Sequence, residues 1–279
     1  MIKSLFINEI IKTISKKRTY IAFILLGFLI PLIVMAIGSG ADYLEQKIYG
    51  QLKDSFIVFG SLTNGFLSTY LIIGVLTGQM PFLTTIVPAE IVSGEYARGT
   101  FRMYLSRPVT RSSVLFSKLL VVLVYTTLIM FFFIFYTLVV SCTLIGIGDL
   151  AVFHKGFLLL SDGDILWRFF LVFMISTSVM ITVSNLCFML STFCKNSVTP
   201  IIITISTVFI GSIISFIPLE IFEFVNPFLF TGYIDLFLVA FHDPIPWELV
   251  LKSTIVCLTW SVSFIIVSFY HFSNKEILE

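Results

Sequence analysis

The chain has 279 residues, of which 58% are hydrophobic and only 12% charged, and its formal net charge is +1. Soluble domains carry about 25% charged residues, so this composition excludes an ordinary soluble domain and indicates an integral membrane protein. The near-zero net charge gives no support for binding of nucleic acid or of an acidic substrate.

The first 18 residues, MIKSLFINEIIKTISKKR, predict an amphipathic helix that lies in the headgroup plane of a membrane. The apolar side chains fall near one helical face, and the charged ones lie elsewhere. That apolar face comprises Ile2, Leu5, Phe6, Ile10 and Ile14. The basic residues also fit a topology signal, and the two interpretations are compatible.

Six apolar runs follow, each near or above the length of about 20 residues that crosses a hydrocarbon core of about 30 Å as a helix. They are Tyr20–Gly38, Phe66–Val87, Val114–Ile145, Trp167–Phe193, Val198–Ile217 and Val250–Tyr270. We therefore expect an all-α integral membrane protein with six transmembrane helices in a single domain, residues 1–279. The third run is long enough to tilt or to protrude from the membrane.

The first run is expected to be retained rather than cleaved as a signal peptide, because it is long and no small-x-small site follows it. Lys and Arg are unevenly distributed between the two sides of the predicted topology. A cytoplasmic N-terminus leaves only five of the 17 basic residues outside, namely Lys47, Lys53, Lys155, Arg168 and Lys252. This bias predicts that both termini are cytoplasmic, in the cell membrane, and that residues 218–248 are extracellular.

The later spans carry stripes of small or weakly polar residues. Ser178, Thr182 and Asn185 share one face of the fourth span. Such stripes most often allow close helix packing, and lining of a translocation pathway is the alternative. Gln79 and Pro81 in the second span are stronger pathway candidates, since Gln is costly facing lipid and a Pro kink frees a carbonyl. No Asp, Glu, Lys or Arg lies deep within a span, which disfavours an ion-coupled carrier.

The sequence holds no motif for metal binding or catalysis. The cysteines Cys142, Cys187, Cys194 and Cys257 are scattered, and the three histidines are isolated from one another. No P-loop and no GxSxG motif occurs, so we expect no ATP hydrolysis and no nucleophile elbow in this chain. We predict no catalytic residue, no metal and no cofactor bound by the chain itself.

The charged strip between the second and third runs, residues 88–113, is where we expect function to lie. Gly99-Thr100 is a natural helix break, and Pro108 ends the short amphipathic piece that follows. Thr110 or Ser112 can then cap the third span. Anchoring on anionic lipid is the simpler alternative; it explains the arginines of the strip but not its Glu residues or its Gly-Thr pattern.

The string GEYARGTFRMYLSRPVTRSSVLFSKLL resembles the signature of ABC-2 type permeases, the membrane subunits of a class of ATP-driven exporters. The matching positions are Glu95, Gly99, Thr100, Leu105, Ser106, Pro108, Arg111 and Lys118. The motif covers under a tenth of the chain, but the amphipathic start, the six spans and the topology agree along its length. The weakly basic link Cys194–Asn196 departs from the pattern, because it offers little for a second coupling contact.

This resemblance implies an exporter subunit that uses ATP hydrolysed by a separate ABC ATPase subunit, with ATP and Mg bound on that partner. It implies a second permease copy or paralogue, with the substrate route between the two, and short or re-entrant helices in residues 218–248. The implied coupling residues are Glu90, Gly94, Glu95, Arg98, Gly99, Thr100, Arg102, Arg107, Pro108 and Arg111. A stand-alone multi-pass membrane enzyme and a membrane scaffold are the alternatives.

Overall fold

The computed structural model describes residues 2–40, 63–97, 99, 110–153, 157–160, 162–217 and 224–274. Within these residues six helical segments are long and apolar enough to cross a membrane, which confirms the predicted six-span, all-α architecture. These segments are Lys17–Ser39, Gly65–Ala97, Arg111–Leu144, Asp164–Phe193, Val198–Ser215 and Trp247–Asn274. A small antiparallel hairpin of β1 (Leu150–Phe153) and β2 (Phe157–Leu160), which the sequence analysis did not predict, joins the third span to the fourth.

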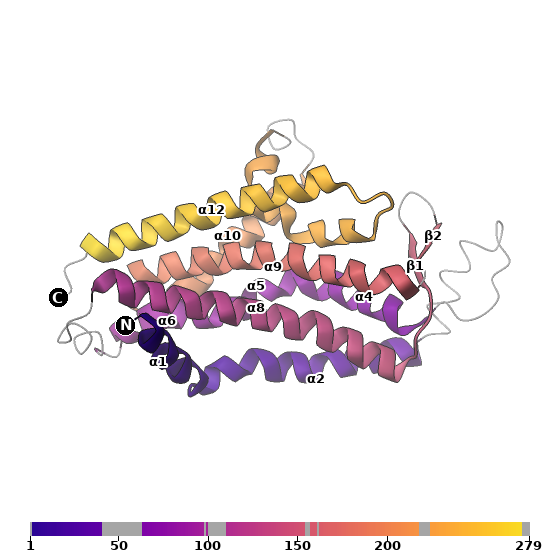
Figure 1. Ribbon diagram of the computed structural model, residues 1–279, viewed down its shortest axis with the longest axis horizontal. Coiled ribbons are helices and arrows are strands. Elements are labelled where there is room, and N and C mark those ends of the chain that lie inside the picture. Colours follow the sequence, from indigo (N-terminus) through magenta and orange to yellow (C-terminus); the bar gives the residue numbers. More distant parts are fainter. Residues whose placement is uncertain are drawn as a thin grey trace.

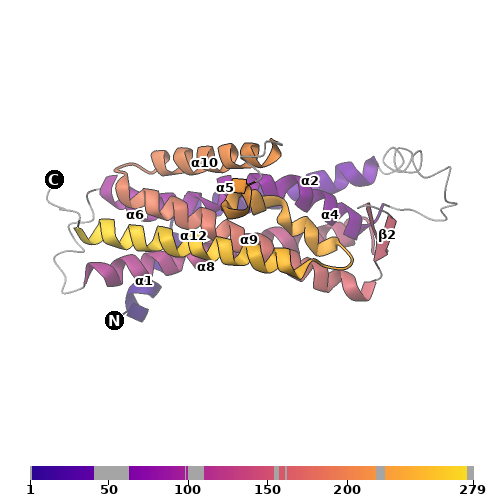
Figure 2. The ribbon, with the colours of Figure 1, turned by 90° about the horizontal axis from the view of Figure 1, so that it is seen from above.

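The spans are arranged around α9 (Asp162–Phe193), which is the most buried of them. Helices α8 (Arg111–Leu144) and α12 (Trp247–Asn274) run beside it along the long axis of the molecule (Figure 1). Helix α2 (Lys17–Ser39) lies at the bottom of Figure 1, and α10 (Val198–Phe216) lies at one edge in Figure 2. In the most apolar 18-residue stretch of α2 and of α10, only 22% of the residues are buried, against 78% in α9. These two helices therefore lie on the exposed outside of the bundle.

The N-terminal helix and the C-terminal end of α12 lie at the same end of the bundle, and the hairpin lies at the other (Figure 1). The short helix α1 (Ile2–Ile14) is at the end that carries the termini. The arrangement agrees with an even number of spans, and it places α1 beside the start of α8. Which end faces the cytoplasm stays a prediction.

The second span is broken in its middle. Helix α4 (Gly65–Leu76) is followed by a 3₁₀ turn, η1 (Thr77–Gln79), then by α5 (Met80–Thr84) and α6 (Ile86–Ala97). The break comes directly before Pro81, which has no N–H to donate to the preceding turn, while the N–H of Met80 bonds to Thr77 in 3₁₀ fashion. The predicted proline distortion is therefore present.

The segment before the last span folds into short helices, as expected for residues 218–248; residues 218–223 lie outside the described part. Helices η2 (Asn226–Phe228) and η3 (Phe230–Phe241) are both 3₁₀ helices. A 3₁₀ run as long as η3 is unusual, because its hydrogen-bond geometry is poorer than that of an α-helix. Tertiary contacts hold it: η3 packs on α9 through a buried face that includes Phe237 and Phe241.

The C-terminal end of η3 is bound by Arg168, a residue for which the sequence suggested no such role. Its guanidinium group donates hydrogen bonds to the carbonyl oxygens of Ala240 and His242, at 3.0 and 2.7 Å. Asp243 lies 3.9 Å from the same group. Arg168 is 8% exposed, so a buried cation on α9 fixes the end of η3 through backbone oxygens that the 3₁₀ helix leaves free.

Candidate functional site

A network of charged side chains lies where α1, α6 and α8 meet, at the end of the bundle that carries the termini. Lys118 of α8 is its centre and is fully buried. Its Nζ atom lies 2.9 Å from Glu9 Oε2 on α1 and 2.8 Å from Glu95 Oε2 on α6. One cation thus joins carboxylates from two other helices.

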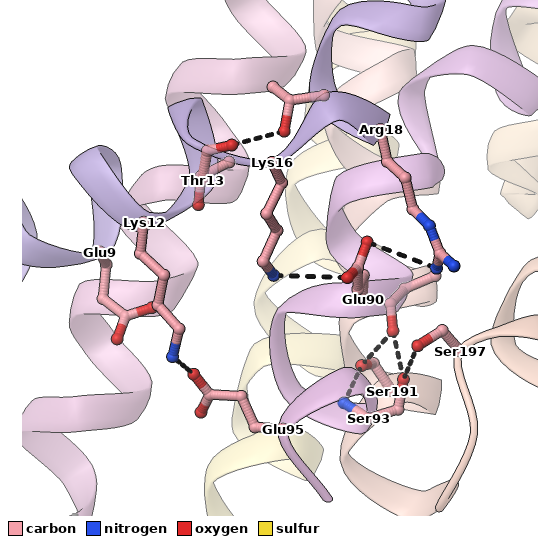
Figure 3. A network of polar contacts seen from close by, with 12 residues as sticks. Glu9, Lys12, Thr13, Lys16, Arg18, Glu90, Ser93, Glu95, Ser191 and Ser197 are labelled. Carbon is pink, nitrogen blue, oxygen red and sulfur yellow. Dashed lines mark hydrogen bonds and ion pairs between the residues drawn. The ribbon is translucent and has the colours of Figure 1, made fainter. Parts of the chain in front are cut away.

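Three further cations, all from the first 18 residues, complete this charge network (Figure 3). Lys12 pairs with the other oxygen of Glu95. Lys16 and Arg18 approach the carboxylate of Glu90 at 3.6 and 3.7 Å. The charge network consists of Glu9, Lys12, Lys16, Arg18, Glu90, Glu95 and Lys118.

Burial decides how these charges act. Glu9, Glu90 and Glu95 are 2%, 6% and 3% exposed. A buried charge is tolerated only where opposite charges and hydrogen bonds replace water, and loss of one partner leaves the other uncompensated. The network therefore specifies where α1 sits on α6 and α8, because Lys118 is neutralised only when both helices are in place.

The side of α1 that faces the protein is mixed, because Phe6 and Ile10 of the predicted apolar face pack on the core beside two buried polar residues. Glu9 and Thr13 are buried, whereas Ile2, Ile11 and Ile14 are 45%, 59% and 53% exposed. The sequence analysis expected the charged side chains of this helix to lie among lipid headgroups, whereas Glu9 is paired with Lys118 inside the protein. The position of α1 in the headgroup plane stays a prediction. The exposed isoleucines leave an apolar face available to lipid, as an interfacial helix requires.

Hydrogen bonds of serine side chains hold α6 against α9 and against the link between α9 and α10. Ser191 donates from its hydroxyl to the Ala89 carbonyl at 2.9 Å and accepts from the Ser93 N–H at 3.0 Å (Figure 3). Gly94 lies against the link between α9 and α10, because a Cβ there would lie 3.3 Å from Ser197 Oγ and also 2.7 Å from Cγ of Glu90 on its own helix. Gly94 thus has a packing role at the helix junction.

The two ends of the predicted coupling segment match the sequence pattern. Helix α6 ends at Ala97, and Gly99 adopts a φ of +66°, which favours glycine and agrees with the predicted helix break. Thr110 occupies the predicted N-cap position of α8, but its side chain makes no capping bond to a backbone N–H, and its hydroxyl instead lies 2.7 Å from that of Ser113. Arg111 donates to the Ser273 carbonyl of α12 at 3.4 Å. The other predicted coupling residues lie outside the described residues: Arg98, Thr100, Arg102, Arg107 and Pro108.

The geometry changes the role expected for Glu90 and Glu95. The resemblance implied that they contact another subunit, yet both carboxylates are buried against cations of their own chain. A direct contact between either carboxylate and a partner would require the charge network to open. Their part in coupling stays a prediction, now through the position of α1, α6 and α8.

Two of the three pathway candidates of the fourth span, Thr182 and Asn185, lie in the interface between α9 and α12. Thr182 donates to the Cys257 carbonyl at 3.1 Å, and Asn185 donates to the Ser261 hydroxyl at 3.0 Å. Ser178 bonds within α9, to Ile175. Thr182 and Asn185 are buried, so their geometry favours the helix-packing interpretation over pore lining.

Gln79 and Pro81, the candidates in the second span, are separated by the break in that span. Pro81 is buried, whereas Gln79 is exposed and lines an apolar cavity of about 320 Å³ between α2, η1 and α5. Leu25 and Leu29, from the middle of α2, line the same cavity. An exposed carboxamide at mid-span is costly in lipid, so Gln79 stays the better pathway candidate.

No group of three or more metal-ligating side chains occurs in the described ranges, and the four cysteines are free. Cys187 and Cys257 are buried among helices, as expected for packing residues. The absence of a metal and of a catalytic centre stays a prediction.

Six apolar helices, of which α9 is the most buried, define a multi-pass helical membrane protein in the described part of the chain. The chain belongs to the family described as "Protein of unknown function (DUF2705)", whose model matches residues 32–278. No curated protein matches the chain. The family match includes α6 and α8 and leaves α1 outside, so Glu9 and Lys12 of the charge network precede the matched residues.

Proposed function

We propose that the chain is the permease subunit of an ABC-2 type transporter, which exports a substrate across the cell membrane with ATP hydrolysed by a separate subunit. The observation that carries the proposal is the junction of α6 and α8. This junction holds the signature residues Glu95, Gly99, Arg111 and Lys118 at one end of a six-span bundle. Two of them, Glu95 and Lys118, form a buried ion pair.

The ion pair supports different roles for different parts of residues 88–113 and the start of α8. Residues 98–109, between α6 and α8, would contact the ATPase, with Arg98, Arg102 and Arg107 as the cationic groups. Glu95 and Lys118 would transmit the movement of the ATPase to the spans. Their pairing with Lys12 and Glu9 would make α1, α6 and α8 move together as a rigid unit. Charge-assisted pairs hold geometry better than neutral hydrogen bonds do.

The substrate would pass along the exposed side of the second span. Helix α2 and helix α10 are the least buried spans, and Gln79 opens into the cavity beside α2. A second permease copy or a paralogue would cover this side. ATP and Mg would be bound by the ATPase, and this chain would carry neither.

The orientation is tested at Cys194, in the link between α9 and α10. In intact cells an impermeant maleimide should leave the variant with Cys194 as its sole cysteine unlabelled, and permeabilisation should restore labelling. Cys194 is partly exposed, so access limits the reaction rather than burial. Lys252→Cys, at an exposed position in the second turn of α12, is the matched control and should be labelled in intact cells. The opposite pattern would reverse the topology.

The function is tested with a P-loop ATPase encoded next to this chain. The purified chain alone should hydrolyse no ATP, and the co-expressed ATPase should copurify with it in detergent. The double variant Arg102→Ala, Arg107→Ala should lose the ATPase, whereas Lys195→Ala, which removes an exposed charge elsewhere, should retain it. ATP turnover by the isolated chain, or an ATPase that binds the double variant as well as the wild type, would contradict the proposal.

A further inference from the structure

A second cavity, of about 270 Å³, lies between α1, α2 and α8 beside the charge network. Its walls are almost entirely apolar, and they include Ile10, Phe23 and Val124. Tyr20, Val124 and Leu128 line it and are 44%, 40% and 53% exposed. The cavity is therefore open on the side of the bundle where α8 faces hydrocarbon.

The bend between α1 and α2 holds the cavity in shape. The Thr19 hydroxyl donates to the Thr13 carbonyl at 2.6 Å, and the Lys16 N–H donates to the same oxygen at 3.2 Å. Glu9 and Lys118 fix α1 on α8 from the other side. The helices that bound the cavity are consequently held in fixed positions relative to one another.

A charge on the same helical face as Tyr20 indicates which molecule fits the cavity. The Lys17 side chain is exposed and makes no ion pair or hydrogen bond in the described ranges, and Lys17 lies one helical turn before Tyr20. A lysine one helical turn from a tyrosine of this apolar cavity matches a phosphate above an acyl chain, since tyrosine and lysine side chains favour the headgroup level.

We propose that this cavity binds one acyl chain of an anionic phospholipid, with the headgroup phosphate paired to Lys17. The lipid would belong to the leaflet on the side of the termini. This site is independent of ATP-driven export, because it depends only on the position of α1 against α2 and α8.

The test uses the purified full-length chain and two photoactivatable lipids, a phosphatidylglycerol and a phosphatidylcholine, with the same diazirine-bearing acyl chain. After irradiation, labelled peptides are quantified by mass spectrometry. Residues 10–23 and 121–128 should be labelled about fivefold more by the phosphatidylglycerol, the preference expected for one basic residue near an anionic headgroup. Equal labelling by the two lipids would overturn the proposal.

Matched variants locate the site. Val124→Trp should fill the cavity and reduce labelling several-fold, whereas Val139→Trp, at an exposed position of the same helix, should not. Lys17→Gln should abolish the preference for phosphatidylglycerol, and Lys195→Gln should preserve it. If Val124→Trp is not monodisperse in detergent, Leu128→Trp replaces it, since Leu128 lines the same cavity. Unchanged labelling in the filled variant would contradict the proposal.

Discussion

Glu95→Ala is expected to lower the free energy of unfolding by about 3–5 kcal/mol, the typical cost of removing one partner of a buried ion pair. Glu95 pairs with both Lys12 and Lys118, and Lys118 is fully buried. After the substitution Lys118 would keep only Glu9 as a counter-charge. Thermal unfolding of the purified chain in detergent measures the effect.

Two further variants separate charge from packing. Glu95→Gln keeps the size of the side chain and should lose nearly as much stability as Glu95→Ala. Adding Lys118→Met to Glu95→Gln should recover most of the loss, because Glu9 and Lys12, three residues apart on α1, can then neutralise each other. Glu248→Ala, at an exposed position of α12, is the control and should change little. A melting temperature for Glu95→Ala equal to that of the control would refute the importance of the network.

The same variants are expected to weaken coupling in the assembled complex. Under the proposed function, Glu95→Gln should reduce substrate-stimulated ATPase activity even at temperatures where the chain remains folded. The reason is that α1 would no longer move with α6 and α8. The comparison with the double variant shows whether stability alone explains the loss, since the double variant regains stability without regaining the connection.

Arg168→Met is expected to release the C-terminal end of η3. The two hydrogen bonds to the Ala240 and His242 carbonyls come from a charged donor, and such bonds contribute about 1.5–3 kcal/mol each. Hydrogen exchange of the backbone amides of η3 should rise sharply, and amides in the central part of α9 should change little. Mass-spectrometric exchange in detergent measures both regions in one experiment.

Lys252→Met is the matched control for Arg168→Met, because it removes an exposed cation from the start of α12. It should leave exchange in η3 unchanged. Arg168→Lys should give partial protection, since an ammonium group lacks the planar fork with which Arg168 reaches two carbonyl oxygens. Protection of η3 that survives in Arg168→Met would show that apolar packing on α9 suffices.

The sequence predicts the spans and their interruptions well, because these depend on local chemistry. Runs of apolar residues identify all six helices, and Pro81 and Gly99 mark the two distortions around α6. The third span was also correctly expected to be long; α8 extends from Arg111 to Leu144. Each of these features follows from hydropathy, a missing N–H or a left-handed backbone.

The charge network was not predicted, because its partners are distant in the sequence and are chosen by tertiary packing. Glu9 and Lys118 are 109 residues apart, and α1 was expected to turn its charged face to headgroups. One signal was present. Lys118 stands between Leu115 and Leu119, among positions that are buried in α8, and a cation in such a stripe requires a carboxylate from elsewhere.

The order of residues along the chain has a consequence for assembly in the membrane. Chains are synthesised from the N-terminus, and both carboxylates that neutralise Lys118 precede it. When the third span leaves the ribosome, Glu9 and Glu95 are already available to receive its lysine. Lys118, which would be the most costly of these cations to expose to lipid without a counter-charge, is thus the last residue of the charge network to be synthesised.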